Sequence, residues 1–414
     1  MTVEQLDCRG RTAAQSGRVI IDHYNAGAAG ARFDAHLDAY DTGLRVWLLE
    51  AGVRHGMTRA EDGSYRLSIM RGLSPAQGSI TGVHHVVAAD DGTVWTGERG
   101  RHVARIDGHE KRIVATAAIA AQAGHLALDA AARLLFIPDP GRNQVIAARA
   151  SDLGIEHTWE APGRPQLPLA SPDGVVCVTG GGSGTLTIAR PRRGGYDVQT
   201  IAVGDHPHDP VFDRNGDHLF VPCLGDGELV KVRLADGFVV GRCAVGDGPS
   251  HLVMHPDGDR VYSANCWDGT LACVSADGER VARAESGAWA HAIDITPDGR
   301  WIYVANFLDD TLAVFDSQTL ARLAVLPTEP YPHGLDISPD GRYVIATGFS
   351  SDFVRLYDAQ KHCEIARIEV GRGSSHSAFL PDADSAFVAC SVSDHVACID
   401  LAARSCVTSL RLHA

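Results

Sequence analysis

A histidine recurs at nearly the same point of a repeat of about 42 residues, in seven of eight consecutive units. Each unit opens with a short apolar run that leads into a turn such as Ser338–Gly341, which reads Ser-Pro-Asp-Gly. The positions five residues before the turn's proline, or its equivalent, follow one another in steps of 40, 42, 42, 42, 41, 42 and 42 residues. A fixed period of this length is typical of folds built from stacked repeats.

Each unit contains four short stretches with the composition of β-strands. In the sixth unit they are His291–Ile295, Trp301–Asn306, Thr311–Phe315 and Ala321–Leu326, which are rich in Val, Ile and aromatic residues. Four antiparallel strands every 40 to 45 residues or so form the blade of a β-propeller. We therefore predict an all-β fold, an eight-bladed propeller over residues 81–414, with seven blades as the alternative if one unit is degenerate.

Residues 1–80 lie outside the repeats and form a predicted N-terminal extension. Gly17–Ile21, Leu44–Leu49 and Tyr65–Met70 have the pattern of strands, and Ala26–Ala31 has the composition of a flexible loop. These strands would complete or brace the last blade and close the ring, or they would cap one face as a lid. The sequence leaves these alternatives open.

The charge distribution limits the partners. The formal net charge is −14, and no Lys/Arg cluster stands out beyond Arg190–Arg193, which argues against nucleic acid. No apolar run reaches the roughly 18–20 residues of a membrane span. The first residues lack a basic start followed by an apolar stretch, so no secretory signal is visible and a cytoplasmic location is expected. The oligomeric state stays open.

The turns and second strands resemble the YVTN-type propeller repeat. The similarity rests on Ser338–Gly341 followed by Arg342–Ile345, and on Thr296–Gly299 followed by Ile302–Asn306, and it extends over residues 82–412. Proteins of this type include lactonase-like enzymes, binding propellers, the nitrous oxide reductase propeller and eight-bladed haem d1 proteins. The last two bind redox centres at the propeller axis with histidine. The chain has no Cys-x-x-Cys-His motif and no cupredoxin-like domain, which argues against a self-contained respiratory reductase.

The recurrent histidines occupy two adjacent positions of the repeat. Sixteen random positions would hold about one histidine at this composition, but these sixteen hold eight. Every unit except the third has one, and the third has Gln166. The histidines five residues before the turn are His85, His125, His251 and His376, and those six residues before it are His84, His208, His291 and His333.

The first strand of each blade lines the central channel, so these histidines should form a ring around the axis. Imidazole is the commonest transition-metal ligand, and a subset of three or four converging rings would hold Cu or Fe at the mouth of the channel. Neighbouring strand residues point to opposite faces. Both sets would therefore reach the mouth only where strands begin and side chains splay; otherwise one set packs between blades. A histidine here would alternatively do no more than hydrogen-bond the next blade.

Four further residues are candidates for catalysis. Asp209 follows His208 directly, and Asp294 and Asp336 come three residues after His291 and His333. Their carboxylates would orient imidazoles or act as a general base; the alternative is that they cap turns or pair with the next blade. Tyr331, in the loop before His333, would wall the substrate pocket.

The sequence favours a metal-dependent enzyme, an oxidoreductase with a Cu or Fe centre that acts on a small molecule. A lactonase-type hydrolase is the first alternative, although such sites usually surround a hard cation with several carboxylates and this ring is rich in imidazole. The second alternative is a non-enzymatic propeller that binds a haem d1-like tetrapyrrole or a protein partner.

Overall fold

The computed structural model describes residues 4–26, 32–38, 44, 55–59, 65–70, 82–98, 102–119, 124–129, 131 and 133–412. The chain divides into two compact units, Met1–Ser79 and Ile80–Ala414. Among the described residues, no helix has both the length and the apolar character needed to cross a lipid bilayer.

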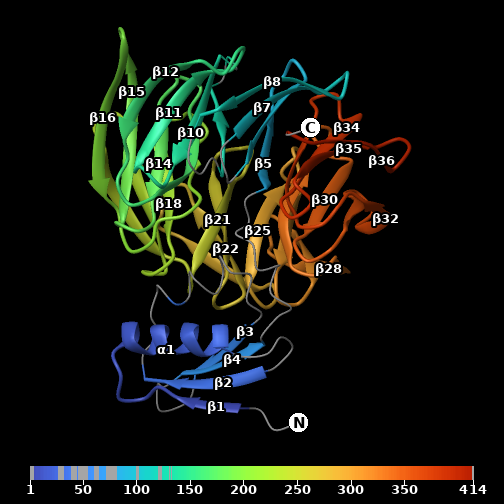
Figure 1. Ribbon diagram of the computed structural model, residues 1–414. Helices are drawn as coiled ribbons and strands as arrows, with labels where there is room; N and C mark the ends of the chain where they lie inside the picture. Colours follow the sequence, from blue (N-terminus) through green and yellow to red (C-terminus); the bar gives the residue numbers. More distant parts are fainter. Residues whose placement is uncertain are drawn as a thin grey trace. The chain divides into compact units, whose positions relative to one another are not determined.

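The second unit is an eight-bladed β-propeller, which confirms the predicted fold class and blade number (Figure 1). Each blade is an antiparallel sheet of four consecutive strands. Blades 1 to 4 are β5 (Val83–Ala88), β6 (Thr93–Glu98), β7 (His102–Asp107), β8 (Arg112–Ala118); β9 (Ala127–Leu128), β10 (Leu134–Asp139), β11 (Gln144–Arg149), β12 (Ile155–Glu160); β13 (Pro165–Ala170), β14 (Val176–Gly180), β15 (Thr185–Arg192), β16 (Gly195–Ala202); and β17 (Val211–Phe212), β18 (His218–Cys223), β19 (Glu228–Arg233), β20 (Phe238–Ala244). Blades 5 to 8 are β21 (Pro249–Met254), β22 (Arg260–Asn265), β23 (Thr270–Ser275), β24 (Val281–Glu285); β25 (Ala290–Ile295), β26 (Trp301–Asn306), β27 (Thr311–Asp316), β28 (Arg322–Pro327); β29 (Pro332–Ile337), β30 (Tyr343–Gly348), β31 (Phe353–Asp358), β32 (Cys363–Glu369); and β33 (Ser374–Phe379), β34 (Ser385–Cys390), β35 (His395–Asp400), β36 (Ser405–Leu410).

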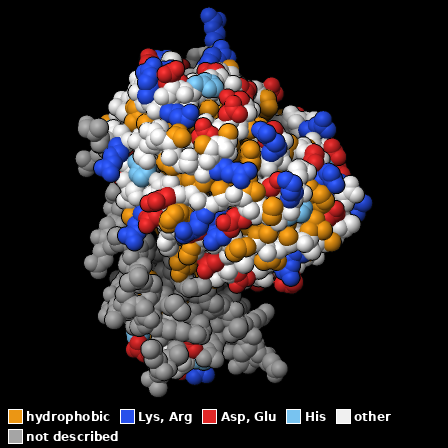
Figure 2. Space-filling model, turned by 90° about the vertical axis from the view of Figure 1, so that its right-hand side faces the viewer, with side chains coloured by type: hydrophobic (Ala, Val, Ile, Leu, Met, Phe, Trp, Pro, Cys, Tyr) orange, Lys and Arg blue, Asp and Glu red, His pale blue; other side chains and the backbone are white. Residues whose placement is uncertain are grey.

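The hydrophobic core is divided among the interfaces between blades. The two middle strands of each blade are mostly buried, whereas the outermost strand alternates exposed and half-buried residues, as in β28. Tyr303 is fully buried between blades 6 and 7, and its hydroxyl donates to the carbonyl of Ala359 at 2.9 Å. On the outer face in Figure 2, basic and acidic side chains are interspersed with apolar ones. Each blade therefore stabilises the next by burying one face of a small apolar layer.

The ring closes by direct contact between blades 8 and 1. Phe387 and Val396 of blade 8 pack with Val83 and Val94 of blade 1 in one buried cluster. The amide of Val83 donates to Oδ1 of Asp394 at 3.2 Å. Each of these blades has four strands of its own, and no described strand of the first unit enters a blade.

The described part of the first unit includes a helix and a four-stranded sheet. Its elements are β1 (Glu4–Asp7), α1 (Ala13–Ala26), β2 (Arg32–Leu37), β3 (His55–Arg59) and β4 (Tyr65–Met70), with the sheet in the order β1-β2-β4-β3. β1 and β2 run parallel and the other pairs antiparallel.

Two sequence predictions for this unit can be compared with the structure. The predicted strand Tyr65–Met70 is β4, but the predicted strand Gly17–Ile21 lies inside α1 and was wrong. A reciprocal capping box explains the helix: Thr12 Oγ1 accepts from the amide of Gln15 at 3.3 Å, and Gln15 Oε1 accepts from the amide of Thr12 at 3.1 Å. Leu44–Leu49 and Ala26–Ala31 lie outside the described residues apart from Leu44 and Ala26.

Phe387→Ala should weaken the closure of the ring. Removing this fully buried ring from the core between blades 8 and 1 should lower the free energy of unfolding by about 3–5 kcal/mol, as for other buried aromatic residues. Urea denaturation of the full chain measures it. Phe238→Ala is the matched control, because Phe238 is 65% exposed and its removal should change stability by less than about 0.5 kcal/mol. Equal effects of the two substitutions would contradict this account of closure.

Candidate functional site

The inner strands share an irregularity at the level of the recurrent histidines. In blade 6, Ala290 pairs with Asn306, but Ile293 pairs with Val304, so the inner strand has one residue more than its partner. The same shift occurs in blades 1, 3, 5, 7 and 8, at Val83/His85, Pro165/Pro168, Pro249/His251, Pro332/Leu335 and Ser374/Ser377. A β-bulge re-aims the side chains at the extra residue. Strict alternation between faces is therefore broken at the two histidine positions.

All eight predicted histidines form one continuous series of ring contacts, which we call the imidazole arc. It passes through blades 4, 5, 6, 7, 8, 1 and 2 in the order His208, His251, His291, His333, His376, His84 and His85, and His125. Centroid separations are 5.1 Å for His208–His251, 4.5 Å for His251–His291, 4.9 Å for His291–His333, 5.0 Å for His333–His376, and 5.0 to 5.1 Å from His376 through His84 or His85 to His125. Both sets of histidines therefore meet at the axis, and the arc is interrupted at blade 3, where Gln166 stands.

Three members of the arc also donate a hydrogen bond to the next blade. This is the structural role that the sequence analysis gave as the alternative to metal binding. Nδ1 of His208 donates to the carbonyl of Ser250 at 3.0 Å. Nδ1 of His291 donates to the carbonyl of His333 at 3.3 Å, and Nδ1 of His333 donates to that of Ser375 at 3.3 Å. A carbonyl only accepts, so Nδ1 carries the proton and Nε2 of the neutral ring keeps its lone pair. Through this bond each of the three rings ties its own blade to the next.

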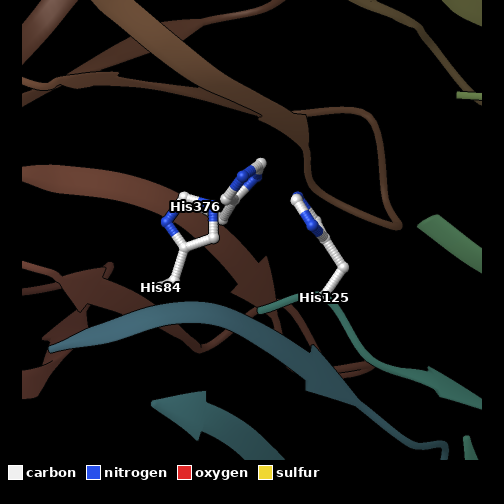
Figure 3. A group of neighbouring side chains, drawn as sticks. All are labelled: His84, His125 and His376. Atoms are coloured by element: carbon white, nitrogen blue, oxygen red, sulfur yellow. The ribbon is translucent and has the colours of Figure 1, made fainter. Parts of the chain in front are cut away.

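One part of the arc has the spacing of a metal site. His84, His125 and His376, the histidine triad, each offer one nitrogen, and these nitrogens lie within 4.8 Å of one another. Figure 3 shows the three rings, from blades 1, 2 and 8, turned toward one another. Nε2 of His376 and Nδ1 of His85 are buried and have no hydrogen-bond partner among the described residues. Buried nitrogens of this kind suit a metal ligand, because a bound ion would satisfy them.

Burial keeps five histidines of the arc neutral. It lowers the pKa of His85 to about 4 and those of His208 and His291 to about 3. Burial, followed by the neighbouring imidazoles, holds the pKa values of His251 and His376 well below the ordinary value. Neutral imidazole is the form that binds metals.

Of the predicted acids, Asp209 lies on the arc. Its Oδ2 is 4.0 Å from Nε2 of His251, and its amide donates to the carbonyl of Ser250 at 3.2 Å. The side chain is 38% exposed, and the surrounding protein partly desolvates the carboxylate, which raises the pKa of its carboxyl to about 7. Asp209 is thus placed to hold or release a proton near neutral pH.

Asp294 and Asp336 connect neighbouring blades. Oδ2 of Asp294 accepts from the amide of Ile337 in blade 7 at 2.9 Å, and Oδ2 of Asp336 accepts from the hydroxyl of Ser377 in blade 8. Burial, with the carboxyl of Asp336 nearby, raises the pKa of Asp294 to about 7, and burial raises the pKa of Asp336 to about 6. Their position corresponds to the interblade role that the sequence offered as the alternative to catalysis.

Aromatic residues that the sequence analysis did not single out lie beside the arc. Phe307 is 5.9 Å from the ring of His291, and Phe349 is 5.6 Å from that of His333. Both are buried, and they stand 42 residues apart at the same point of the repeat, which is the signal that would have identified them. Tyr331 packs on Phe307 at 5.1 Å and has a backbone φ of 58°. It therefore joins the arc indirectly, through Phe307.

Known proteins share this fold at low sequence identity. A dihydro-heme d1 dehydrogenase, NirN, in complex with DHE has a TM-score of 0.63 and 18% identity, over 71% of this chain and 68% of its own. Hydrazine synthase from Kuenenia stuttgartiensis has a TM-score of 0.57 and 18% identity, over 67% of this chain and 95% of its own. At these identities the likeness shows the fold alone. A search of curated proteins finds no significant match.

The sequence itself matches a family model, described as a lactonase with a seven-bladed β-propeller, over residues 194–362 and 326–412. These ranges together span just over half of the chain, from the last strand of blade 3, β16, to the end of blade 8. The ring described above has eight blades rather than the seven of the family description. On this match, the protein belongs to the lactonase β-propeller family.

Proposed function

We propose that the protein is a metal-dependent oxidoreductase that acts on a small molecule, with a Cu or Fe centre bound by His84, His125 and His376. The observation that carries the proposal is the triad itself, three imidazole nitrogens within 4.8 Å of one another at the axis. Sites made only of imidazole suit Cu, Fe or Zn rather than Ca or Mg, and among divalent ions copper binds nitrogen ligands most strongly. Such a metal would supply electron transfer to the reaction.

The residues around the triad have separate tasks in this proposal. His85 contacts His125 and His376 at 5.1 and 5.0 Å, so it offers a further nitrogen at the same place. Phe349 backs the arc with an apolar surface that keeps water away. Asp209 accepts or returns a proton, because its carboxyl has a pKa near the working pH.

Elemental analysis of untagged protein tests the metal site. We expect about one equivalent of Cu or Fe per chain. His376→Ala should weaken metal binding about tenfold or more, because removing a metal ligand should cost at least as much affinity as removing a residue that hydrogen-bonds such a ligand. His109→Ala is the matched control, because His109 is 58% exposed and lies outside the arc.

Two results would contradict the metal proposal. One is the absence of metal from native protein, and the other is an equal affinity for the metal in His376→Ala and His109→Ala. An absorption spectrum of the same sample separates the tetrapyrrole alternative, which the similarity to NirN keeps in view. A Soret-type band would favour a bound tetrapyrrole over a mononuclear centre.

Asp209→Asn tests whether the pKa of the Asp209 carboxyl, the proposed proton carrier, is raised in the folded protein. The pKa of this carboxyl is about 7 in the folded protein against an ordinary value of 3.8. The protonated carboxyl contributes fully to the free energy of unfolding at low pH. This contribution is lost as the pH rises through 7, because the carboxyl of the unfolded chain releases its proton at a lower pH than that of the folded protein. The gain in unfolding free energy on substitution should therefore be larger at pH 8 than at pH 5, by about 1 kcal/mol after allowance for exposure.

Urea denaturation at the two pH values measures this difference. Asp236→Asn, an exposed carboxyl of the same blade, removes the same charge and serves as the control. A gain for Asp209→Asn that is independent of pH would show that this carboxyl is an ordinary surface acid.

The family match favours a second candidate, a lactonase-type hydrolase. In that case a metal on the triad would polarise the lactone carbonyl, and Asp209 would act as general base. Release of acid from simple γ- and δ-lactones, without any electron acceptor, would select this function over oxidation. Its loss in Asp209→Asn, with metal still bound, would assign the base.

A further inference from the structure

The end of the arc farthest from the triad is a row of hydrogen-bond acceptors. His208 and His291 use Nδ1–H on carbonyls of the next blade, at 3.0 and 3.3 Å. Burial keeps both neutral. Each such ring therefore presents an Nε2 lone pair and no second donor. The row consists of His208, His251 and His291 in blades 4, 5 and 6, with neighbouring ring centroids 5.1 and 4.5 Å apart.

A carboxylate stands at the first end of this row. No donor among the described residues bonds the Asp209 side chain, and its nearest potential cation is Nε2 of His251 at 4.0 Å, which is too long for a hydrogen bond. The backbone is fixed, because the amide of Asp209 and Nδ1 of His208 both donate to the carbonyl of Ser250. The carboxylate is thus held in place and lacks a counter-ion within the described chain.

The inner strands provide no positive charge to offset these acceptors. The described strands β5, β9, β13, β17, β21, β25, β29 and β33 contain no Lys or Arg. Arg164 and Arg372, in the loops before β13 and β33, are exposed. An anion on this row would face lone pairs and a carboxylate, whereas a cation would find complementary groups.

A second metal ion is not the best occupant of the row. Within the described residues, the one group of ligands with metal-like spacing is the triad, and His208, His251, His291 and His333 are not part of it. Their nitrogens are spread along the ring instead. An organic ammonium group has three donors and no acceptor, so it can bond Asp209 and neighbouring Nε2 atoms together. Its carbon chain would then lie along the row toward the triad.

We infer that the row from His208 to His291, with Asp209 as counter-ion, binds the ammonium group of an amine. That the amine is the substrate rests on the proposed metal enzyme, but the binding itself does not. The site lies where blades 4, 5 and 6 meet, and the inner strands of blades 5 and 6 carry the bulge.

Calorimetric titration of the full-length protein with three probes of similar size tests the inference: n-butylammonium, 1-pentanol and pentanoate. We expect n-butylammonium to bind at least about tenfold more tightly than the other two, since a charge-assisted bond is worth more than a neutral one. Asp209→Asn should weaken n-butylammonium about tenfold or more by the same reasoning. Asp236→Asn, an exposed carboxyl of the same blade, should leave its affinity within about twofold.

His376→Ala separates this inference from the proposed function. It removes a triad ligand and should abolish tight metal binding while n-butylammonium still binds as in wild type. Native protein that binds n-butylammonium but no metal would overturn the metal enzyme and leave the amine site standing. Tighter binding of pentanoate, or an unchanged affinity in Asp209→Asn, would overturn the amine site whether or not metal is present. Thermal unfolding of each variant confirms that it is folded.

Discussion

The site depends on one extra residue at the start of the inner strand. In a regular strand, adjacent residues point to opposite faces, so His84 and His85, or the sets they represent, could not share a surface. The bulge in six blades removes that restriction where it matters. Because the blades repeat, this local irregularity recurs around the ring, and the histidines of blades 1, 5, 6, 7 and 8 lie beside it.

The arc shows how a structural and a chemical use of histidine can coexist. One nitrogen of His208, His291 and His333 ties its blade to the next, as expected for a purely structural residue. That bond also decides which nitrogen carries the proton, and it leaves the other as an acceptor. Burial then keeps the rings of His208 and His291 neutral. The same interactions that tie neighbouring blades together thus also fix the tautomer of these imidazoles.

Membership of the lactonase propeller family establishes the scaffold and leaves the chemistry to the site. Propellers host unrelated activities because the axis is lined by a few positions per blade that vary independently of the core. Here those positions are rich in imidazole, and two of the carboxylates on the inner strands, Asp294 and Asp336, are engaged with the next blade. The donor set therefore favours a transition metal over the hard cations that carboxylate-rich sites bind.

Most of the fold could be predicted from the sequence, because each blade is a local unit with its own turns and alternation. The period predicted eight blades, and the repeat position predicted the histidines and the gap at Gln166. Gly17–Ile21 was misread because five apolar and polar residues fit a strand as well as a helix, and only the Thr12–Gln15 cap distinguishes them. Phe307 and Phe349 were not recognised, since their contact with the arc crosses between strands.

The sequence by itself determined which residues occupy the axis, because that follows from the period alone. Only the tertiary structure decided that both histidine sets meet, that three of them have metal spacing, and that Asp209 rather than Asp294 lies on the arc. The reason is physical: a bulge is defined by the pairing of two strands, and a triad by three blades, so neither is encoded in the spacing of any single strand.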